Sequence, residues 1–423
     1  MFARRLGRGI RLHISTESVP DLRGYDAIVI GAGFAGSVIA RELAERASMS
    51  VALVESRDHI GGNSYDALDE HGVLVHRYGP HIFHTANERV FSYLSRFTQW
   101  RAYEHRVLAR LDESTYIPVP FNKTSIEIAF GKERGAELID KLVEAYGDER
   151  KVPIAQLRQT DDPDLAELAD FVYENVFRHY SSKQWGTDPS TLDPSITGRV
   201  PVFISRDDRY FQDPFQGMPA QGYTRLFESL LDCEGIDLFL GLDARSFLGF
   251  AGDGERLLQA VVNGEPYSGI VVFTGSVDEL FGFRFGRLPY RSLDFDFETL
   301  PMRRFQPCAT VNYTVSEDYT RITEFSHLTG QELEVTTIMR EYPCAYEGKP
   351  GQIPYYVVPG EESARRYGQY AELAASISRF HLLGRLAEYR YYNMDAVVAR
   401  ALELADDLCE QAQLAGKKVL QDG

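Results

Sequence analysis

The residues most able to do chemistry in this sequence are three glycines and one acid near its N-terminus. Gly31, Gly33 and Gly36 have the spacing G-x-G-x-x-G, and Glu55 follows about 20 residues later. In this pattern the first glycine makes a tight turn, the second lets backbone N–H groups approach a pyrophosphate, and the third allows close helix packing. The acid accepts hydrogen bonds from a ribose. The spacing therefore predicts a dinucleotide site.

The segments around the glycines have the order that such a site requires. Residues 27–30 and 51–54 are short apolar runs, typical of buried parallel strands. Residues 37–46 predict a helix, whose N-terminus would face the phosphates with the positive end of its dipole. Strand, glycine loop, helix, strand and acid together form the dinucleotide-binding fingerprint. The alternative is a glycine turn in an α/β domain without a ligand.

The fingerprint does not distinguish NAD from FAD. Gly61, Gly62 and Asn63 follow the acid closely, and a glycine pair lets the chain pass near a ligand without Cβ atoms. This arrangement is similar to that of FAD-binding oxidoreductases of the glutathione-reductase and amine-oxidase type. An ordinary loop is the alternative interpretation.

Length, composition and charge limit the possible functions. The 423 residues, 44% of them hydrophobic and 25% charged, suffice for two or three domains with a large core. The net charge of −17 argues against nucleic acid or an anionic membrane as partner. An anionic ligand would therefore need a local basic pocket. No apolar run approaches the roughly 18 residues of a membrane span.

The cysteines and the N-terminal segment indicate where the protein works. The four cysteines are scattered without C-x-x-C spacing or clustered histidines, so we expect no metal site and a reducing cytoplasm. Residues 1–24 contain five arginines but no long apolar core, which excludes a secretory signal. We interpret them as a disordered leader or as the product of a start codon assigned too early; an organelle-targeting segment is the alternative.

Two histidines follow the nucleotide-binding half of the chain. His81 and His84 flank two apolar residues after a Gly-Pro break. Their spacing could bind a metal, but no carboxylate or cysteine shares the segment. We therefore expect a histidine near the cofactor or a structural histidine.

Aromatic residues gather in residues 176–186. Phe177, Tyr180 and Trp185 alternate with Ser, Lys and Gln donors, which favours a planar ligand such as a nucleobase stacked on a ring. Core packing is the commoner explanation for such spacing. Residues 190–202 read as a flexible loop around Arg199, which could close over a phosphate or lie on the surface in solvent.

The remaining segments alternate between helical and strand-like patterns. Expected helices are residues 90–97, 223–231 and 396–414, with several more in 125–175. Expected strands are a hairpin of 106–111 and 115–120, then 237–240, 269–275, 310–314, 336–339 and 355–358. Residues 215–219 are expected to form a loop. An N-cap at Asn393 or Asp395 would aim backbone N–H groups at an anion or a flavin.

Six stretches of the sequence resemble UDP-galactopyranose mutases of the prokaryotic type. They are Gly-Pro-His-Ile-Phe-His (79–84), His-Tyr-Ser-Ser-Lys-Gln-Trp-Gly (179–186), Phe-Gln-Gly-Met-Pro-Ala-Gln-Gly-Tyr (215–223), Tyr-Thr-Arg-Ile-Thr-Glu (319–324), Arg-Glu-Tyr-Pro (340–343) and Gly-Arg-Leu-Ala-Glu-Tyr-Arg-Tyr-Tyr (384–392). They follow the order of the family over nearly the whole chain. The first and last are far more specific than the glycine fingerprint.

The resemblance implies an α/β fold with α+β insertions. A discontinuous, Rossmann-like FAD-binding domain would comprise residues 25–103, 218–281 and 358–423. Residues 123–203 would form a helical bundle with a mobile loop. Residues 104–122, 204–217 and 282–357 would form an antiparallel β-sheet domain.

The resemblance also implies an isomerase that interconverts UDP-galactopyranose and UDP-galactofuranose. FAD would be reduced, by a reductant such as NAD(P)H, although no net redox occurs. In the family mechanism the reduced flavin N5 attacks the anomeric carbon and displaces UDP. A flavin–sugar iminium forms, the ring opens and recloses as the furanose, and UDP returns. The resemblance further suggests a homodimer.

By resemblance, Arg385 would lie beside the isoalloxazine and stabilise the anionic reduced flavin. His84 would lie near the flavin, where it could tune N5 or assist proton transfer, and Met394 would lie at the ring edge. The residues expected to bind FAD are Gly31, Gly33, Gly36, Glu55, Gly62, Asn63, His81, Arg385 and Met394.

UDP is an anionic leaving group, so cations must meet its diphosphate as charge develops. By resemblance, Arg199 and Arg321 are the two clamps, and with Arg385 and His84 they form the expected catalytic set. Tyr180 would stack on uracil. Further expected substrate contacts are the hydroxyl groups of Tyr210, Tyr355 and Tyr391, the residues Phe177 and Trp185 beside uracil, and Ser181, Asn312, Asn393 and His105.

Four positions depart from the commonest family pattern. Asn393 stands where many members carry Asp, so the resemblance supplies no carboxylate acid or base there. Ser181 replaces a usual Thr, Val176 a usual Phe, and His105 a common Asn. These changes leave the chemistry intact and bear on uracil contacts and affinity.

Two other functions are weighed against the mutase. An FAD-dependent oxidoreductase of the amine-oxidase type would share the fingerprint, but it would not need Arg199, Arg321 and a set of tyrosines around a diphosphate. A non-catalytic FAD-binding partner protein would bind FAD without any reductant-dependent sugar chemistry.

Overall fold

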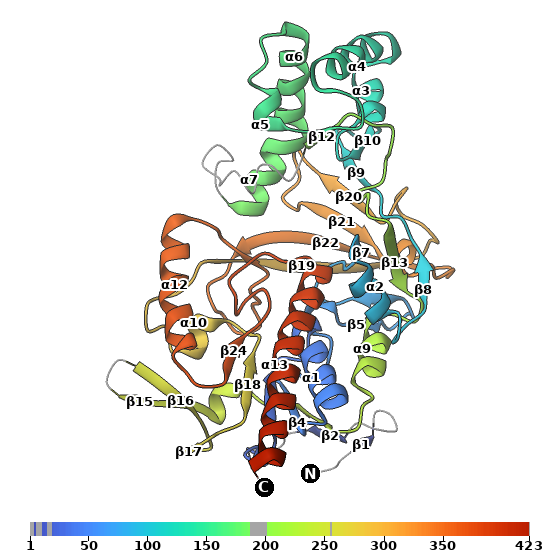
Figure 1. Ribbon diagram of the computed structural model, residues 1–423. Coiled ribbons are helices and arrows are strands. Elements are labelled where there is room, and N and C mark those ends of the chain that lie inside the picture. The colour runs from blue at the N-terminus through green and yellow to red at the C-terminus, as the bar shows by residue number, and fades with distance from the viewer. Residues whose placement is uncertain (1–3, 6–10, 15–18, 187–200, 254–255, 423) are drawn as a thin grey trace.

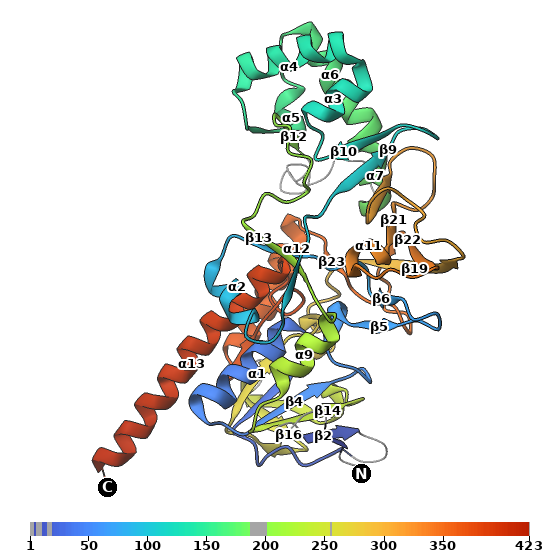
Figure 2. The ribbon, with the colours of Figure 1, turned by 90° about the vertical axis from the view of Figure 1, so that its right-hand side faces the viewer.

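The structure is a computed structural model that describes residues 4–5, 11–14, 19–186, 201–253 and 256–422. Figure 1 shows a parallel sheet with its helices at the bottom, an antiparallel sheet across the middle and a helical lobe at the top. In Figure 2 the helical lobe projects from one end, and the long helix α13 (Met394–Asp422) runs along the other. Within the described ranges, no helix has the length and apolar composition that crossing a membrane requires.

The parallel sheet forms the base of the molecule. In spatial order its strands are β1 (Arg4–Arg5), β2 (Arg11–Ile14), β14 (Ile236–Leu240), β4 (Val51–Glu55), β3 (Ala27–Ile30), β18 (Ile270–Phe273) and β24 (Phe380–Leu382). Strand β1 pairs antiparallel with β2, and the other neighbours are parallel. Every residue of β3, β4 and β18 is buried, as expected for central strands covered on both faces. The predicted strands and the predicted α/β class are confirmed.

Helices and a small sheet cover the two faces of the parallel sheet. Helix α1 (Phe34–Ala47) packs against α13, with Val38, Ile39 and Leu43 fully buried. Other covering elements are α9 (Tyr223–Leu231), α10 (Val277–Leu280), α12 (Glu361–Ala375), η4 (Ala244–Ser246), β15 (Leu248–Asp253), β16 (Arg256–Val262) and β17 (Glu265–Pro266). The helices predicted at 37–46, 223–231 and 396–414 are therefore present.

The N-terminal segment contributes to this sheet. Strand β2 pairs with β14 in parallel, with Leu12 opposite Leu238, and the His13 ring stacks on Phe239 at 4.6 Å. Leu22 is fully buried. The expectation of disorder is wrong for residues 11–14, because the open edge of β14 accepts a further strand. The other leader residues 1–3, 6–10 and 15–18 lie outside the described part of the chain.

The antiparallel sheet spans the middle of the molecule. In spatial order its strands are β10 (Tyr116–Val119), β9 (Val107–Arg110), β20 (Thr310–Tyr313), β21 (Arg321–Glu324), β22 (Thr336–Ala345), β19 (Tyr290–Leu300) and β23 (Tyr356–Val357). Only the β20–β9 pair within this sheet is parallel. Helix α11 (Phe325–Thr329) follows β21. The predicted hairpin and strands at 310–314 and 336–339 are confirmed.

A small three-stranded sheet corrects one prediction. Residues 215–219, expected as a loop, form β13 (Phe215–Pro219) between β7 (Phe83–Thr85) and β8 (Trp100–Ala102). Its partners are distant in sequence, so no local pattern announces the pairing. Nearby elements are η1 (Gly62–Ser64), β5 (Asp66–Leu68), β6 (Leu74–His76) and α2 (Glu88–Leu94).

The helical lobe has a hydrophobic core of its own. It contains α3 (Lys123–Phe130), α4 (Lys132–Tyr146), α5 (Ile154–Leu157), α6 (Pro163–Val172), α7 (His179–Trp185), β11 (Lys151–Pro153) and β12 (Pro201–Phe203). Asp162 caps α6, and Pro163 begins it. Residues 173–178 form a π-helical turn before α7, a feature frequent at functional sites.

Candidate active site

One cavity of about 1160 Å³ extends from the glycine loop to α7 and the antiparallel sheet. It brings together most of the residues predicted for cofactor and substrate. Predicted residues that line it are Gly31, Gly33, Glu55, Gly62, Asn63, His81, His84, His105, Tyr180, Tyr210, Asn312, Arg321, Tyr355, Arg385, Tyr391, Asn393 and Met394. Both parts of the predicted chemistry therefore face the same space.

The glycine loop is shaped for close backbone approach. Gly31 has φ +102°, and a Cβ there would lie 2.0 Å from Thr274 Oγ1. A Cβ on Gly36 would lie 1.8 Å from the Gly31 carbonyl oxygen. Gly62 approaches Gly33 so closely that an added Cβ would lie 2.9 Å from the Gly33 Cα. These contacts require glycine, and they leave a cradle that suits a pyrophosphate.

Glu55 lies at the end of β4 with its carboxylate held by backbone donors. Its Oε2 accepts from Ala32 N at 2.9 Å, and its Oε1 accepts from Arg57 N at 3.0 Å. A carboxylate has roughly four lone-pair sites, so capacity remains for a ribose hydroxyl. The Ser56 hydroxyl also donates to Oε1 at 3.2 Å, so the acid that the sequence spacing indicated stands beside the glycine loop with about one acceptor site open, on Oε2. These residues fit a dinucleotide cofactor.

His81 and Met394 are far apart in the sequence, but both line the cavity. Burial lowers the pKa of His81 to about 4, so its ring is neutral near pH 7. Its backbone N–H donates to His76 Nδ1 at 3.0 Å. Met394, the first residue of α13, directly follows Asn393 and lies 3.9 Å (Sδ) from Ser64 Oγ.

Arg385 lies among tyrosines in the segment that follows β24. Its guanidinium donates to the Tyr355 carbonyl oxygen at 2.8 Å. Its Cζ lies 5.4 Å from the Tyr356 ring centre and 4.9 Å from that of Tyr391. Tyr355 is buried, and burial raises the pKa of its hydroxyl, so the hydroxyl keeps its proton. The cluster presents one cation and several hydroxyl donors to the cavity.

The second end of the cavity is built around Arg321 on β21. Its guanidinium donates to the Tyr180 hydroxyl, and its Nε lies 3.4 Å from Glu341 Oε1. Burial opposes the charge on Arg321, but the Glu341 carboxylate raises the pKa of the guanidinium well above its ordinary value. Burial raises the pKa of Tyr180 to about 12. The site thus holds a permanent cation beside a protonated phenol.

Asn312 lies next to Arg321 across the β20–β21 pair. Its side chain is buried, and among the described residues its Oδ1 has no hydrogen-bond partner. Buried polar atoms in folded proteins are almost always paired. An unpaired amide oxygen that lines a cavity therefore marks a position where a ligand donor would fit.

Helix α7 supplies only one of the predicted uracil contacts to the cavity. Tyr180 lines it, whereas Phe177 belongs to the buried core of the helical lobe and Ser181 is buried. The Trp185 ring lies 6.5 Å from the ring of Tyr356. The structure therefore brings Tyr180 to the site and leaves Phe177, Ser181 and Trp185 out of the cavity lining.

Lys183 binds backbone carbonyl groups and does not line the cavity, although the polar residues around it favoured a ligand contact. Its Nζ donates to three backbone carbonyl oxygens, those of Tyr313, Glu317 and Tyr319, at 2.6, 2.9 and 3.2 Å. An ammonium group has three donors, so none is left over. Lys183 thereby ties α7 to the β20–β21 hairpin that carries Asn312 and Arg321.

Some predicted positions cannot be placed or lie at the rim. Arg199 and most of the loop 190–202 fall outside the described residues. Tyr210 and Tyr391 line the cavity and are 37% and 38% exposed, so solvent reaches them. His105 is buried, and its Nδ1 lies 3.1 Å from the Tyr103 hydroxyl.

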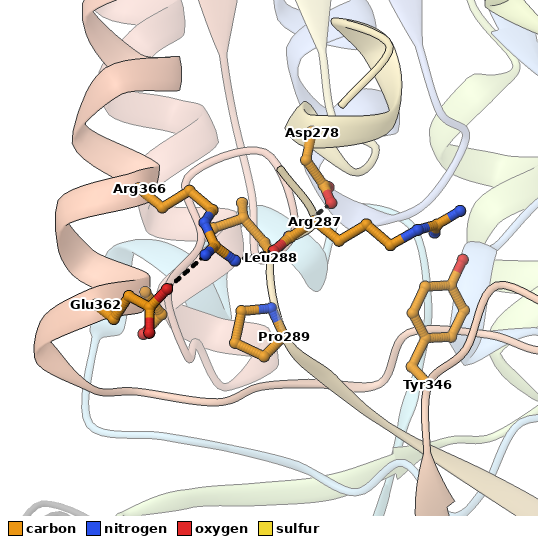
Figure 3. A pocket seen from close by; sticks show the side chains of 8 residues that line it. Asp278, Arg287, Leu288, Pro289, Tyr346, Glu362 and Arg366 are labelled. Carbon is orange, nitrogen blue, oxygen red and sulfur yellow. Dashed lines mark hydrogen bonds and ion pairs between the residues drawn. The ribbon is translucent and has the colours of Figure 1, made fainter. Parts of the chain in front are cut away.

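A second cavity of about 370 Å³ lies between α10 and α12 (Figure 3). Several of its charged groups already have partners within the protein. Asp278 accepts from Leu288 N at 2.9 Å, and Arg366 is paired with Glu362, as the dashed lines in Figure 3 show. Tyr346 borders both cavities and donates to Glu279 at 2.7 Å. The predicted functional residues lie in the larger cavity.

Comparison with known proteins decides the family. The family model described as UDP-galactopyranose mutase matches residues 175–391. A UDP-galactopyranose mutase of Mycoplasma pneumoniae is 35% identical over 392 residues, covering 91% of this chain and 96% of that protein. The chain belongs to the UDP-galactopyranose mutase family. A model of a NAD(P)-binding Rossmann-like domain also matches residues 29–97.

Other relatives show the breadth of this mutase family. A probable UDP-galactopyranose mutase of Klebsiella pneumoniae is 37% identical, covering 91% of this chain and 95% of that protein. A dTDP-fucopyranose mutase of Escherichia coli is 33% identical, and the match covers 89% of this chain and 97% of that protein. A crystal structure of reduced UDP-galactopyranose mutase matches with a TM-score of 0.67 at 16% identity, covering 93% and 95% of the two chains. At that identity, the structural match speaks for the fold alone.

Two residues near the site were missed by sequence reasoning. Glu341 is buried against Arg321, although it stands within the Arg-Glu-Tyr-Pro stretch that carries the family resemblance. Asp213 is hydrogen-bonded to His84 and lies two residues before the stretch 215–223. Each lies in or within two residues of a stretch that carries the resemblance, and this position was the signal that could have found it.

Proposed function

We propose that this protein interconverts UDP-galactopyranose and UDP-galactofuranose with reduced FAD as cofactor. The observation that carries the proposal is the single cavity that joins the glycine loop to the Arg321–Tyr180 pair. A dinucleotide cradle and a cationic, aromatic site open to the same space, as a flavin-dependent nucleotide-sugar enzyme needs. The names of the curated relatives point to the same reaction.

The cofactor end would hold FAD through backbone and acid contacts. Gly31, Gly33 and Gly62 leave room for the pyrophosphate, and Glu55 has an acceptor site left for a ribose hydroxyl. Arg385 would lie near the ring system, where a cation stabilises an anionic reduced flavin. Bound and reduced, FAD would supply the nucleophile for the anomeric carbon.

The other end would hold UDP. The protein carries a net charge of −17, so a diphosphate needs a local cation. Arg321 supplies one that cannot lose its proton, and the hydroxyls of Tyr355 and Tyr391 would add donors. Tyr180 offers an aromatic face for uracil. Arg199 would be the second clamp, as the family resemblance implies.

Three associated proposals concern the setting of the enzyme. NAD(P)H would reduce the flavin, the protein would act as a homodimer, and it would work in the cytoplasm. Support comes from the resemblance and from the scattered, free cysteines. A dTDP-sugar is the second candidate substrate, because a dTDP-fucopyranose mutase is 33% identical over most of both chains.

The experiment incubates the purified protein with UDP-galactofuranose, with and without dithionite, and separates the products by chromatography. We expect UDP-galactopyranose only under reduction. dTDP-fucofuranose is run in parallel, and faster turnover of that compound would reassign the substrate. Oxidation of an amine with consumption of O₂, and no sugar conversion, would favour an amine-oxidase-type enzyme. Bound, reducible FAD with neither reaction would favour the non-catalytic alternative.

A further inference from the structure

A histidine–carboxylate pair lies at the wall of the main cavity. His84 Nδ1 and Asp213 Oδ2 are 2.6 Å apart, and His84 lines the cavity. An ionised carboxylate only accepts hydrogen bonds, so the bonded proton lies on Nδ1, and whenever the ring carries a single proton its Nε2 keeps a lone pair. Within the described residues Nε2 makes no hydrogen bond, and it is not fully buried.

The surrounding turn fixes the orientation of this imidazole. The Phe211 ring stacks on His84 with centroids 3.5 Å apart and planes 12° from parallel. Gln216, the register partner of His84 across the β13–β7 pair, donates to the carbonyl oxygens of Phe211 and Asp213 at 3.0 and 2.9 Å. The same strand pairing thus places the ring, the stacking partner and the carboxylate.

The proposed reaction requires one proton to move within the sugar. In the pyranose, O5 belongs to the ring and O4 carries a proton, whereas in the furanose O4 belongs to the ring and O5 carries the proton. The forward conversion therefore breaks the C1–O5 and O4–H bonds and forms the C1–O4 and O5–H bonds. No oxidant or reductant is consumed, but one proton must leave O4 and one must reach O5, which a single acid–base group can bring about.

We propose that the Asp213–His84 pair carries this proton. Nε2 of His84 first accepts the proton from O4, and the resulting imidazolium, beside the Asp213 carboxylate, delivers it to O5 as the C1–O5 bond breaks; O4 then closes on C1. Asp213 is a positioning residue that keeps the lone pair on Nε2. The proposal rests on the proposed mutase function. A triad-like carboxylate has the same orienting effect on histidine in hydrolases.

A second histidine that lines the cavity, His105, is unsuited to the task. Burial, with the nearby charge of Arg321, lowers the pKa of His105 to about 3, so its ring is a weak base. Its Nδ1 is also engaged with the Tyr103 hydroxyl at 3.1 Å. Of His84 and His105, it is His84 that combines a carboxylate partner with an accessible ring nitrogen.

The first test compares Asp213→Asn with a matched control. The amide keeps the shape of the side chain but removes the charge, so we expect kcat to fall about 10- to 100-fold, a typical part of general acid–base catalysis. KM, FAD content and UDP affinity should stay within twofold. Asp207→Asn, in the same segment but paired with Arg209 at 2.7 Å, should keep its kcat. An unchanged kcat in Asp213→Asn would overturn the proposal.

A double-mutant cycle separates positioning from a general structural role. His84→Gln should lose more kcat than Asp213→Asn, and adding Asp213→Asn to His84→Gln should lower kcat little further, since the two residues act as one unit. A full additional loss in the double variant would show that Asp213 acts independently of His84, which contradicts the proposal.

A measurement without substrate distinguishes failure of this proposal from failure of the proposed function. The ¹⁵N signals of the His84 ring report which nitrogen carries the proton. We expect the Nδ1–H form in the wild type and a loss of that preference in Asp213→Asn. A wild-type Nε2–H form would overturn the pair even in an active mutase. An inactive wild type with the Nδ1–H form would count against the mutase function instead.

Discussion

The glycine-loop end of the main cavity and its Arg321 end differ in what places their functional groups. At the glycine loop, the groups come from residues 30–63, and much of the geometry is backbone: Ala32 N bonds to Glu55, and Gly33 lies against Gly62. The strands beneath, β3 and β4, are completely buried. Short-range spacing alone can specify such an arrangement.

The Arg321 end is assembled from side chains of distant elements. Tyr180 comes from α7, Arg321 from β21 and Glu341 from β22, and Lys183 fastens α7 to the hairpin. The antiparallel register, with Arg321 opposite Glu341, brings the ion pair together. The contrast teaches that backbone sites are local in sequence, whereas side-chain sites depend on the pairing of strands.

The largest expected effect comes from breaking the glycine-loop end with Gly36→Ala. The added Cβ would lie 1.8 Å from the Gly31 carbonyl oxygen and 3.2 Å from Val29 Cγ1, and backbone cannot move aside as a flexible side chain can. We expect FAD content to fall about tenfold or more, since overpacking typically costs ~1–3 kcal/mol. Flavin absorbance per protein measures this loss. Gly249→Ala, with open space around its Cβ, is the matched control and should keep the flavin absorbance of the wild type.

This contrast also explains how far the sequence could predict the structure. The strands at 27–30 and 51–54, the helix at 37–46 and the position of Glu55 follow from apolar runs and glycine spacing, and the structure has all of them. These features are local, and their physical requirements are met by residues close in the chain. The roles assigned to individual site residues remain proposals.

What the sequence could not predict depends on long-range pairing. Residues 215–219 contain Gly and Pro and look like a loop, yet they pair with β7 and β8 from another part of the chain. Residues 11–14 look disordered because their partner β14 lies more than 200 residues away. The partners of Glu341 and Asp213 cannot be read from the sequence, because the fold brings Glu341 to Arg321 and Asp213 to His84.

At the Arg321 end, Arg321→Met removes the cation and leaves Glu341 buried beside an apolar side chain. We expect kcat to fall ~10²–10³-fold, the usual loss when a group that stabilises developing charge is removed. FAD content should stay near that of the wild type, because the glycine loop is untouched. Steady-state kinetics and flavin absorbance test both statements.

Arg340→Met is the matched control for Arg321→Met. Arg340 lies on the neighbouring strand and pairs with Asp296 and Glu298 at 3.1 and 2.7 Å, outside the cavity lining. Its loss should leave kcat within a few-fold. Equal losses in the two arginine variants would show that the sheet, and not the cation in the cavity, controls turnover.

A smaller effect is expected when the tie between α7 and the hairpin is cut. Lys183→Met leaves the carbonyl oxygens of Tyr313, Glu317 and Tyr319 without their donor. We expect UDP to bind about tenfold more weakly, because Tyr180 and Arg321 are no longer held in register, at a stability cost of ~1–3 kcal/mol. Calorimetric titration with UDP measures the affinity. Lys132 is an exposed lysine on α4, and Lys132→Met should bind UDP with wild-type affinity. Wild-type affinity in Lys183→Met would show that Lys183 does not hold Tyr180 and Arg321 in place.

The least local expected effect is a pH dependence of folding stability to which both ends of the cavity contribute. Burial lowers the pKa of His81 to about 4 and, with the charge of Arg321, that of His105 to about 3, against 6.5 for the ordinary side chain. The unfolded chain therefore binds more protons below pH 6.5, and stability present above that pH is lost as the pH falls toward 4. Each histidine should cost roughly 2 kcal/mol between pH 6.5 and 5. In His105→Asn, the decrease in the urea-unfolding free energy between pH 6.5 and 5 should be smaller by one such amount. An unchanged pH slope would show that His105 is already protonated in the folded protein.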